Sequence, residues 1–149
     1  MPPQIRAMCP SDAQAVAVLL PELGYQASAS QVQERFSLLV ARPENGLFVA
    51  EIATAVVGWA HVYGVRLIAS EGYAEIGGLV VSARHQRQGI GAQLVHACER
   101  WAANTSYGRV RLRSGVHREP AHQFYESLGY ARSRSSYAFE RLVAISTTA

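Results

Sequence analysis

Two glycines preceded by arginine and glutamine residues mark the stretch of this sequence that is best suited to bind an anion. The loop Gln86–Gly91 reads Gln-Arg-Gln-Gly-Ile-Gly and stands between an apolar run and a long amphipathic segment. A helix that begins here would present free backbone N–H groups and the positive end of its dipole to a phosphate. Gly89 and Gly91 leave the backbone open to a pyrophosphate, and Arg84 and Arg87 add positive charge. A plain helix-entry turn is the alternative, because a glycine pair alone is a weak motif.

The loop differs from two common phosphate-binding motifs. It lacks the third glycine of the dinucleotide-binding fingerprint, and no Gly-Lys-Ser/Thr follows as in a P-loop. No metal site is predicted, because the five histidines show no tight ligand spacing. His117 and His122 flank one predicted helix start, where a surface or capping role is favoured over a metal or substrate role. Cys98 falls on an apolar helix face and has no paired base, so an acyl-enzyme is not expected.

The length and composition fit one globular domain over residues 1–149, with a frayed tail expected at residues 144–149. Hydrophobic residues make up 49% and charged residues 17%, which is typical of a folded protein rather than a disordered one. No run reaches the ~18 apolar residues that a membrane span needs. The N-terminus lacks an apolar signal core and the two cysteines are too few for a disulfide scaffold, so the cytoplasm is expected. The net charge of +3 comes without a basic block, so no nucleic-acid partner is expected.

The apolar periodicity predicts a mixed α/β order, β-α-α-β-β-β-α-β-α-β, with six to seven strands and four helices. The two amino-terminal helices are expected to begin with capping boxes at Ser11–Gln14 and Ser30–Gln33. A hairpin is predicted to turn at Thr54–Ala55. The expected strands cover residues 4–8, 47–53, 56–68, 73–81 and 109–114, with one or two more within 130–142, and the expected helices cover residues 11–24, 30–41, 89–104 and 120–129.

Two motifs within this order resemble those of the GNAT acetyltransferases. Gln86-x-x-Gly89-x-Gly91 is similar to the family's Gln/Arg-x-x-Gly-x-Gly/Ala signature, and it follows the strand that ends at Val81. About 35 residues further on, Ala121–Tyr130 resembles the second family motif, Ala-x-x-Phe/Leu-Tyr-x-x-x-Gly-Phe/Tyr. The spacing Arg118-x-x-Ala-His-x-Phe-Tyr also resembles a subgroup that includes aminoalkylphosphonate N-acetyltransferases. Many members have an asparagine where this chain has Arg118. The asparagine usually contacts the pantetheine, and the sequence leaves open whether Arg118 makes a contact in its place.

The resemblance implies that acetyl-CoA binds between the strands Tyr73–Val81 and Arg109–Ser114. The loop Arg87–Ala92 would then hold the pyrophosphate through backbone N–H groups, and the N–H of Leu79 would act as an oxyanion donor to the thioester. Gly77 and Gly78 would mark a β-bulge that splays the two strands. The residues expected to bind the cofactor are Leu79, Val80, Val81, Gln86, Arg87, Gln88, Gly89, Gly91, Ala92, Arg118 and Phe124.

Acetyl transfer to an amine needs a base, because a typical amine is protonated at neutral pH. Glu75 is the candidate base, directly or through water, since it is the only carboxylate on the central strand and matches the family's catalytic glutamate in position. A solvent-facing glutamate that only orders water or the amine is the alternative. Tyr125 matches the motif tyrosine that lies near the CoA sulfur in many members, so it is the candidate acid. Core packing of its ring is compatible with that role.

The expected activity is N-acetylation of a small-molecule primary amine by direct attack in a ternary complex. Protein acetylation, on a lysine or an N-terminus, and a non-catalytic acyl-CoA sensor are the alternatives. The acceptor is expected to meet the first two helices, their connection Glu22–Ser28 and the turn Val65–Gly72, with Tyr25, Glu22 and Glu71 as candidate contacts. Trp59, His61 and Tyr63 share one strand face and fit an acceptor pocket or core packing equally well. Homodimerisation through the strand Ser135–Leu142 is a further expectation.

Overall fold

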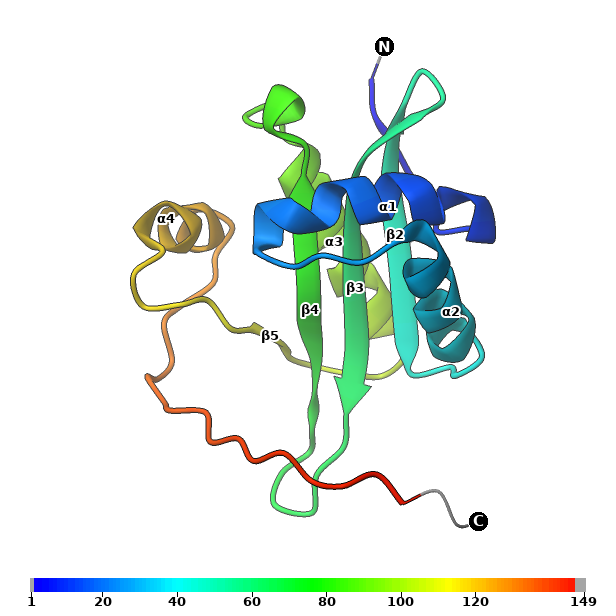
Figure 1. The fold of residues 1–149 in the computed structure, drawn as a ribbon. Coiled ribbons are helices and arrows are strands. Elements are labelled where there is room, and N and C mark those ends of the chain that lie inside the picture. The colour runs from blue at the N-terminus through cyan, green and yellow to red at the C-terminus, as the bar shows by residue number, and fades with distance from the viewer. Residues whose placement is uncertain (1, 147–149) are drawn as a thin grey trace. The chain divides into compact units, whose positions relative to one another are not determined.

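The sheet that carries the candidate site is built from five strands, which are all that residues 2–146, the part described by this computed structural model, contain. Their order across the sheet follows the sequence, and each neighbouring pair is antiparallel except the last, which is parallel (Figure 1). The strands are β1 (Gln4–Ala7), β2 (Asn45–Ile52), β3 (Ala55–Val65), β4 (Tyr73–Val81) and β5 (Val110–Leu112).

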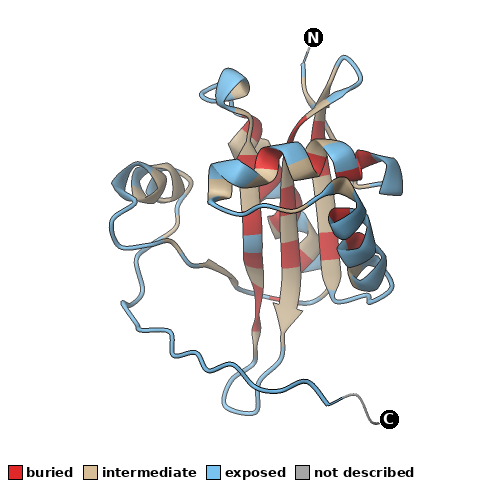
Figure 2. Cartoon of the chain, in the orientation of Figure 1, coloured by how far each residue is buried: buried red, intermediate tan, exposed pale blue. Residues whose placement is uncertain are grey.

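Helices cover both faces of this sheet. The short α1 (Ala13–Leu19) and α2 (Ala29–Val40) lie on one face, and α3 (Ile90–Asn104) lies on the other. Buried positions recur along the central strands, as Figure 2 shows, and α3 has its buried residues at helical spacing, among them Ile90, Leu94 and Cys98. Leu94, Val95 and Cys98 of α3 are fully buried against the sheet, which confirms the apolar face expected for this helix.

The hairpin between β2 and β3 turns one residue earlier than predicted. Ala53 and Thr54 both have positive φ angles, of 48° and 72°, which is the backbone of the tight turns that match strand twist. No glycine or asparagine occupies either position. The hairpin therefore forms without the usual turn residues, and Ala53 and Thr54 carry the backbone strain that glycine would avoid.

Both predicted capping boxes are shifted. The box of α2 is Ser28 with Gln31, joined by reciprocal hydrogen bonds of 3.1 and 2.9 Å, rather than Ser30 with Gln33. At the first helical entry, the backbone N–H of Cys9 donates to the Asp12 carboxylate at 2.7 Å, so the Ser11–Gln14 box does not form. Sequences with several polar residues near a helix start allow more than one cap, and the site that is used depends on where the preceding chain leaves the sheet.

The chain divides into two compact units between Arg113 and Ser114. The second unit contains α4 (Glu119–Ser127), which begins with Pro120 in its first turn and is followed by Gly129 at φ 95°. The strands expected within residues 130–142 are not formed: from Tyr130 to residue 146, where the described chain ends, there is no helix or strand. The sheet thus has five strands rather than six or seven. Alternating apolar residues supply strand propensity, but a strand also needs a paired edge.

Tyr137 and Phe139 of that segment are 91% and 95% exposed. Within residues 2–146 no helix combines the length and the apolar character that crossing a membrane would require.

Candidate functional site

The parallel pairing of β4 with β5 ends halfway along β4. Ala74, Glu75 and Ile76 pair with Val110, Arg111 and Leu112, and no strand in residues 2–146 continues this ladder beside the rest of β4. The second half of β4, from Gly77 to Val81, therefore pairs with β3 alone. Its backbone groups on the β5 side are free of strand partners and can bind an extended ligand. This confirms the splayed strands expected from the sequence.

A β-bulge lies where the two halves of β4 meet. His61 pairs with Gly78 and Val62 pairs with Ile76, so Gly77 is the extra residue. A Cβ atom at Gly77 would come within 2.8 Å of the Tyr63 ring, and one at Gly78 within 2.6 Å of the Trp59 ring. Both positions thus need glycine because aromatic side chains of β3 cover them. We call Trp59, His61 and Tyr63 the aromatic row.

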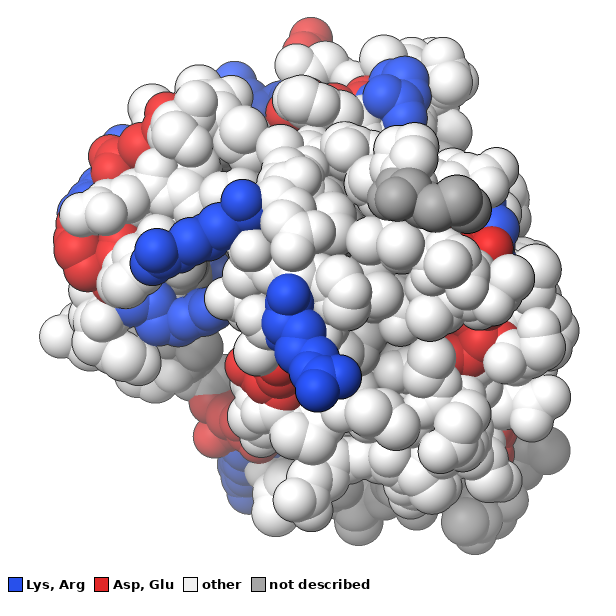
Figure 3. All heavy atoms as spheres, turned by 90° about the horizontal axis from the view of Figure 1, so that it is seen from above, with Lys and Arg blue, Asp and Glu red and all other residues white. Residues whose placement is uncertain are grey.

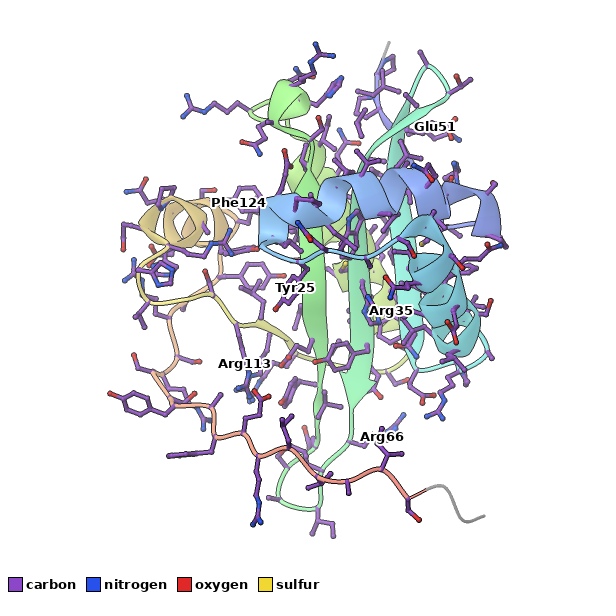
Figure 4. The ribbon with its side chains drawn as sticks, in the orientation of Figure 1. Tyr25, Arg35, Glu51, Arg66, Arg113 and Phe124 are labelled. Atoms are coloured by element: carbon purple, nitrogen blue, oxygen red, sulfur yellow. The ribbon has the colours of Figure 1, made fainter. Side chains whose placement is uncertain are left out.

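Glu75 lies beside this row, on the sheet face that α1 and α2 cover. Its side chain is only 13% exposed, and its Oε2 accepts a hydrogen bond of 2.7 Å from the Tyr63 hydroxyl. The Nε atom of Arg113 lies 3.9 Å from the other oxygen, Oε1, and the Arg113 side chain is 67% exposed (Figure 4). One carboxylate oxygen is therefore held by a short hydrogen bond, while the other has only a long contact with a solvated cation.

Two groups of the aromatic row have perturbed ionisation. Burial raises the pKa of the Tyr63 hydroxyl to about 12, and the hydrogen bond to Glu75 adds to the shift. Burial lowers the pKa of His61 below its ordinary value, so the ring is neutral at pH 7. The Nε2 atom of His61 lies 2.9 Å from the Asn45 Oδ1 atom, and its ring centroid is 5.4 Å from that of Tyr63. The row is uncharged and braced from β2.

The loop between β4 and α3 has an open backbone at the helix start. Gly89 precedes the first turn of α3 at φ 81°, Arg87 is also at positive φ (64°), and no described side chain caps the helix. The N–H groups of the first turn therefore have no intrahelical partner. A Cβ atom at Gly89 would meet no described atom within 4 Å, so the loop is open at this position. This geometry fits the pyrophosphate of CoA.

Other predicted loop residues have structural contacts. The Gln86 side-chain amide donates to the Val81 carbonyl at 3.2 Å, so it braces the loop. The backbone N–H of Ala83 donates to the Glu22 carboxylate at 3.0 Å. Glu22, which was expected near the acceptor, is thus bonded to the start of the loop between β4 and α3. The spacing of residues in the sequence does not predict this contact. Arg87 and Gln88 are exposed, and Figure 3 shows arginine side chains on the face that is uppermost in Figure 1.

The second unit holds the other motif residues. The Tyr125 ring packs edge-on against Phe124 and Tyr130, at centroid distances of 5.1 and 6.3 Å. Burial raises the pKa of the Tyr125 hydroxyl, and the nearby Arg118 guanidinium opposes part of that shift. The hydroxyl is therefore protonated at neutral pH and can donate a proton or a hydrogen bond.

The segment before α4 is held by His122. Its Nε2 atom is 2.8 Å from the Gly115 carbonyl oxygen, and its Nδ1 atom is 3.3 Å from a Glu119 carboxylate oxygen. Arg118 is the residue before α4, and its N–H donates to the same Gly115 carbonyl at 3.0 Å. Among residues 2–146, no three His, Cys, Asp or Glu side chains gather closely enough to hold a metal ion.

Of the remaining acceptor candidates, Tyr25 is 67% exposed in the connection to α2, and Glu71 is exposed in the turn before β4 (Figure 4). Cys98 is fully buried, as expected, and burial raises the pKa of its thiol to about 12. Such a thiol is a poor nucleophile at neutral pH.

Comparison with known proteins agrees with this geometry. The model of the acetyltransferase (GNAT) family matches residues 14–130. No curated protein sequence matches the chain. Among solved structures, a transcriptional regulator from Bacillus halodurans C-125 is 22% identical, with a TM-score of 0.83 and coverage of 94% of this chain and 100% of that one. A glucosamine-6-phosphate N-acetyltransferase from Arabidopsis thaliana is 19% identical, with a TM-score of 0.81 and coverage of 94% and 99%.

A third similar structure is AAC(6')-Iy in complex with the bisubstrate analogue CoA-S-monomethyl-acetylneamine. It is 16% identical, with a TM-score of 0.83 and coverage of 95% of this chain and 100% of that one. These identities establish a shared fold, whereas the family match spans most of the chain and both of its motifs. The chain belongs to the acetyltransferase (GNAT) family, whose members take the acetyl group from acetyl-CoA.

Proposed function

We propose that this acetyltransferase transfers the acetyl group of acetyl-CoA to a primary amine of a small molecule, by direct attack of the amine in a ternary complex. The observation that carries the proposal is the position of Glu75. Its side chain is only 13% exposed and lies two residues before the bulge that opens β4, with Oε2 held by Tyr63 and Oε1 in a long contact of 3.9 Å with Arg113. A fixed carboxylate whose second oxygen has no short hydrogen bond among the described residues is suited to take a proton from an ammonium group or from an intervening water.

The donor site would be formed by the unpaired half of β4 and the start of α3. Leu79, Val80 and Val81 offer backbone groups to the pantetheine arm, and the loop Arg87–Ala92 offers N–H groups to the pyrophosphate. Acetyl-CoA supplies an activated thioester, and the N–H of Leu79 would stabilise the charge that develops on the thioester oxygen. Phe124 of the second motif, and Arg118 at the position where many members have an asparagine, are the further cofactor contacts proposed.

The leaving thiolate needs a proton, for which Tyr125 is the proposed donor. Its hydroxyl keeps its proton well above neutral pH because burial raises its pKa. The two compact units would then act as parts of one acetyltransferase domain, since the family match at residues 14–130 runs across both.

The class of acceptor is supported by the names of two structural relatives. One is called a glucosamine-6-phosphate N-acetyltransferase, and the other was solved with an analogue that joins CoA to an acetylneamine. Both names point to small amines. Kinship with aminoalkylphosphonate N-acetyltransferases, a homodimer and a cytoplasmic location stay predictions from the sequence.

Turnover of acetyl-CoA over a panel of primary amines tests the proposal. Glu75→Gln and Tyr125→Phe should each lower kcat/KM by about 10²- to 10⁴-fold with unchanged unfolding temperature. Glu44→Gln and Tyr137→Phe change an exposed residue of the same type and serve as matched controls. Activity that survives Glu75→Gln would remove the base assignment. Binding of acetyl-CoA without turnover of any small amine would favour a sensor, or an acceptor that is a protein.

A further inference from the structure

The aromatic row contains one hydroxyl that touches the proposed base. Tyr63 and Glu75 are register partners across β3 and β4, and the tyrosine Oη atom lies 2.7 Å from the glutamate Oε2 atom. We propose that Tyr63 is a positioning residue for Glu75. In this arrangement Tyr63 holds Oε2 and leaves Oε1 to accept the proton, and Gly77 is glycine so that the Tyr63 ring can lie over the bulge. The inference deepens the proposed function, since it rests on Glu75 as the base.

The hydrogen bond has a fixed direction. Because the pKa of the Tyr63 hydroxyl is raised to about 12, the phenol keeps its proton over the whole range in which an acetyltransferase is assayed. Tyr63 is therefore the donor and Glu75 the acceptor at every such pH. A donor to a carboxylate stabilises the ionised form, which is the form that a general base needs.

The ring of Tyr63 has two close neighbours. The neutral His61 ring lies 5.4 Å away and is itself anchored at 2.9 Å to Asn45. The second is Gly77, where a Cβ atom would come within 2.8 Å of the Tyr63 Cε1 atom and 3.8 Å of the His61 Nδ1 atom. Since Cβ atoms essentially never come so close to another heavy atom, any other residue at position 77 would displace the Tyr63 ring.

The neighbouring glycine provides an internal comparison. A Cβ atom at Gly78 would approach the Trp59 ring at 2.6 and 2.7 Å. It would disturb the same strand by a similar amount, but at Trp59, which has no hydrogen bond to Glu75. Comparing substitutions at the two glycines therefore distinguishes a general destabilisation of the sheet from a specific effect on Glu75.

Among the described residues, two side-chain partners face Glu75. Tyr63 comes from β3, and Arg113, whose Nε atom lies 3.9 Å from Oε1, follows the end of β5. Arg111 pairs with Glu75 in the parallel register, and its guanidinium lies over the Tyr73 ring at 4.2 Å. Deleting the Tyr63 hydroxyl removes its own hydrogen bond and leaves the arginine contacts in place, so Tyr63→Phe isolates a single hydrogen bond.

The test is the pH dependence of kcat/KM for Tyr63→Phe with the best amine of the panel. Loss of the donor destabilises the ionised Glu75, so the acid limb of the profile should move to higher pH by about one unit. The turnover on the high-pH plateau should stay within a few-fold of the wild type. Tyr107→Phe removes a buried tyrosine hydroxyl on the opposite face of the sheet and should leave the limb in place.

Gly77→Ala should shift the acid limb in the same direction as Tyr63→Phe, whereas Gly78→Ala should not. Carboxyl-¹³C NMR gives a readout that does not depend on turnover. The resonance missing from Glu75→Gln identifies Glu75, and its titration midpoint should rise in Tyr63→Phe. An unmoved midpoint overturns the proposal, as does an equal shift in Tyr107→Phe. Full activity of Glu75→Gln would instead remove the base assignment, while the midpoint would still report on the Tyr63 contact.

Discussion

Replacing Gly89 by alanine tests whether the loop before α3 holds the pyrophosphate. Gly89 has a φ of 81°, and an added Cβ atom would meet no described atom within 4 Å. The substitution therefore creates no clash in the free protein, and its cost is the backbone strain of an L-residue in the left-handed region, about 1–2 kcal/mol. That strain is either kept, which lowers stability, or relieved by rotating the loop, which redirects the N–H groups of the first helical turn.

The two outcomes predict different changes in the affinity for CoA and in Tm. If binding of CoA requires the strained loop, the affinity should fall by roughly 5- to 30-fold, because 1.4 kcal/mol is a factor of ten. Strain that is kept should lower Tm by roughly 2–8 °C for a chain of this size. Isothermal titration with CoA measures the first quantity and thermal unfolding the second. Pantetheine, which lacks the pyrophosphate, should bind the variant as it binds the wild type.

Gly24 offers a closely matched control. It has a φ of 86° and an equally open environment, with no atom of the described chain within 4 Å of an added Cβ. Gly24→Ala should therefore lower Tm as Gly89→Ala does and leave the affinity for CoA unchanged. Equal loss of affinity in both variants would show that stability alone is responsible. Unchanged affinity in Gly89→Ala, with an unchanged loop, would refute the assignment of the pyrophosphate site.

Three further predictions concern ionisable groups outside the site. Ellman's reagent should titrate the exposed Cys9 in the native protein and reach the buried Cys98 only after unfolding. Because burial raises the Cys98 pKa from 9.0 to about 12, the stability linked to this thiol is complete below pH 9 and is lost as the pH rises towards 12. Urea unfolding of Cys98→Ala should show a flatter pH dependence there. Hydrogen bonds from Arg6 lower the Asp12 pKa below 3.8, so stability present above that pH is lost as the pH falls through the lowered value. Asp12→Asn should abolish this acid limb and cost about 1–3 kcal/mol at pH 7.

Much of the donor half of the site could be predicted from the sequence. The bounds of β4 and α3, the bulge at Gly77–Gly78 and the open loop all follow from local signals, namely apolar period, glycine position and helix entry. The placement of Trp59, His61 and Tyr63 on one face also follows from alternation along a strand. Local patterns of this kind need no knowledge of which segments meet.

Contacts between strands could not be predicted in the same way. The bond from Tyr63 to Glu75 depends on the register of β3 against β4, and the bulge changes that register by one residue. Without the bulge, continuation of the pairing from His61 with Gly78 would place Gly77 opposite Val62 and Ile76 opposite Tyr63. The contact of Glu22 with Ala83 spans 61 residues and likewise leaves no trace in local spacing. The prediction of strands after Tyr130 was wrong for a related reason. Strand propensity does not show which sheet edge a segment would pair with.

The bulge at Gly77 lets Glu75 and Gly78 share one face of the sheet although they are three residues apart. Side chains along a regular strand alternate between its two faces, so a pairing that shifts by one residue reverses every position beyond the shift. If Gly77 paired with Val62 and closed the bulge, Tyr73 and Glu75 would turn towards the layer of α3, and Ala74 and Ile76 would come to the face of the aromatic row. The strand would keep all of its residues, while its carboxylate would move into an apolar layer. In any redesign of this acetyltransferase, the bulge between Ile76 and Gly78 is therefore a constraint in its own right.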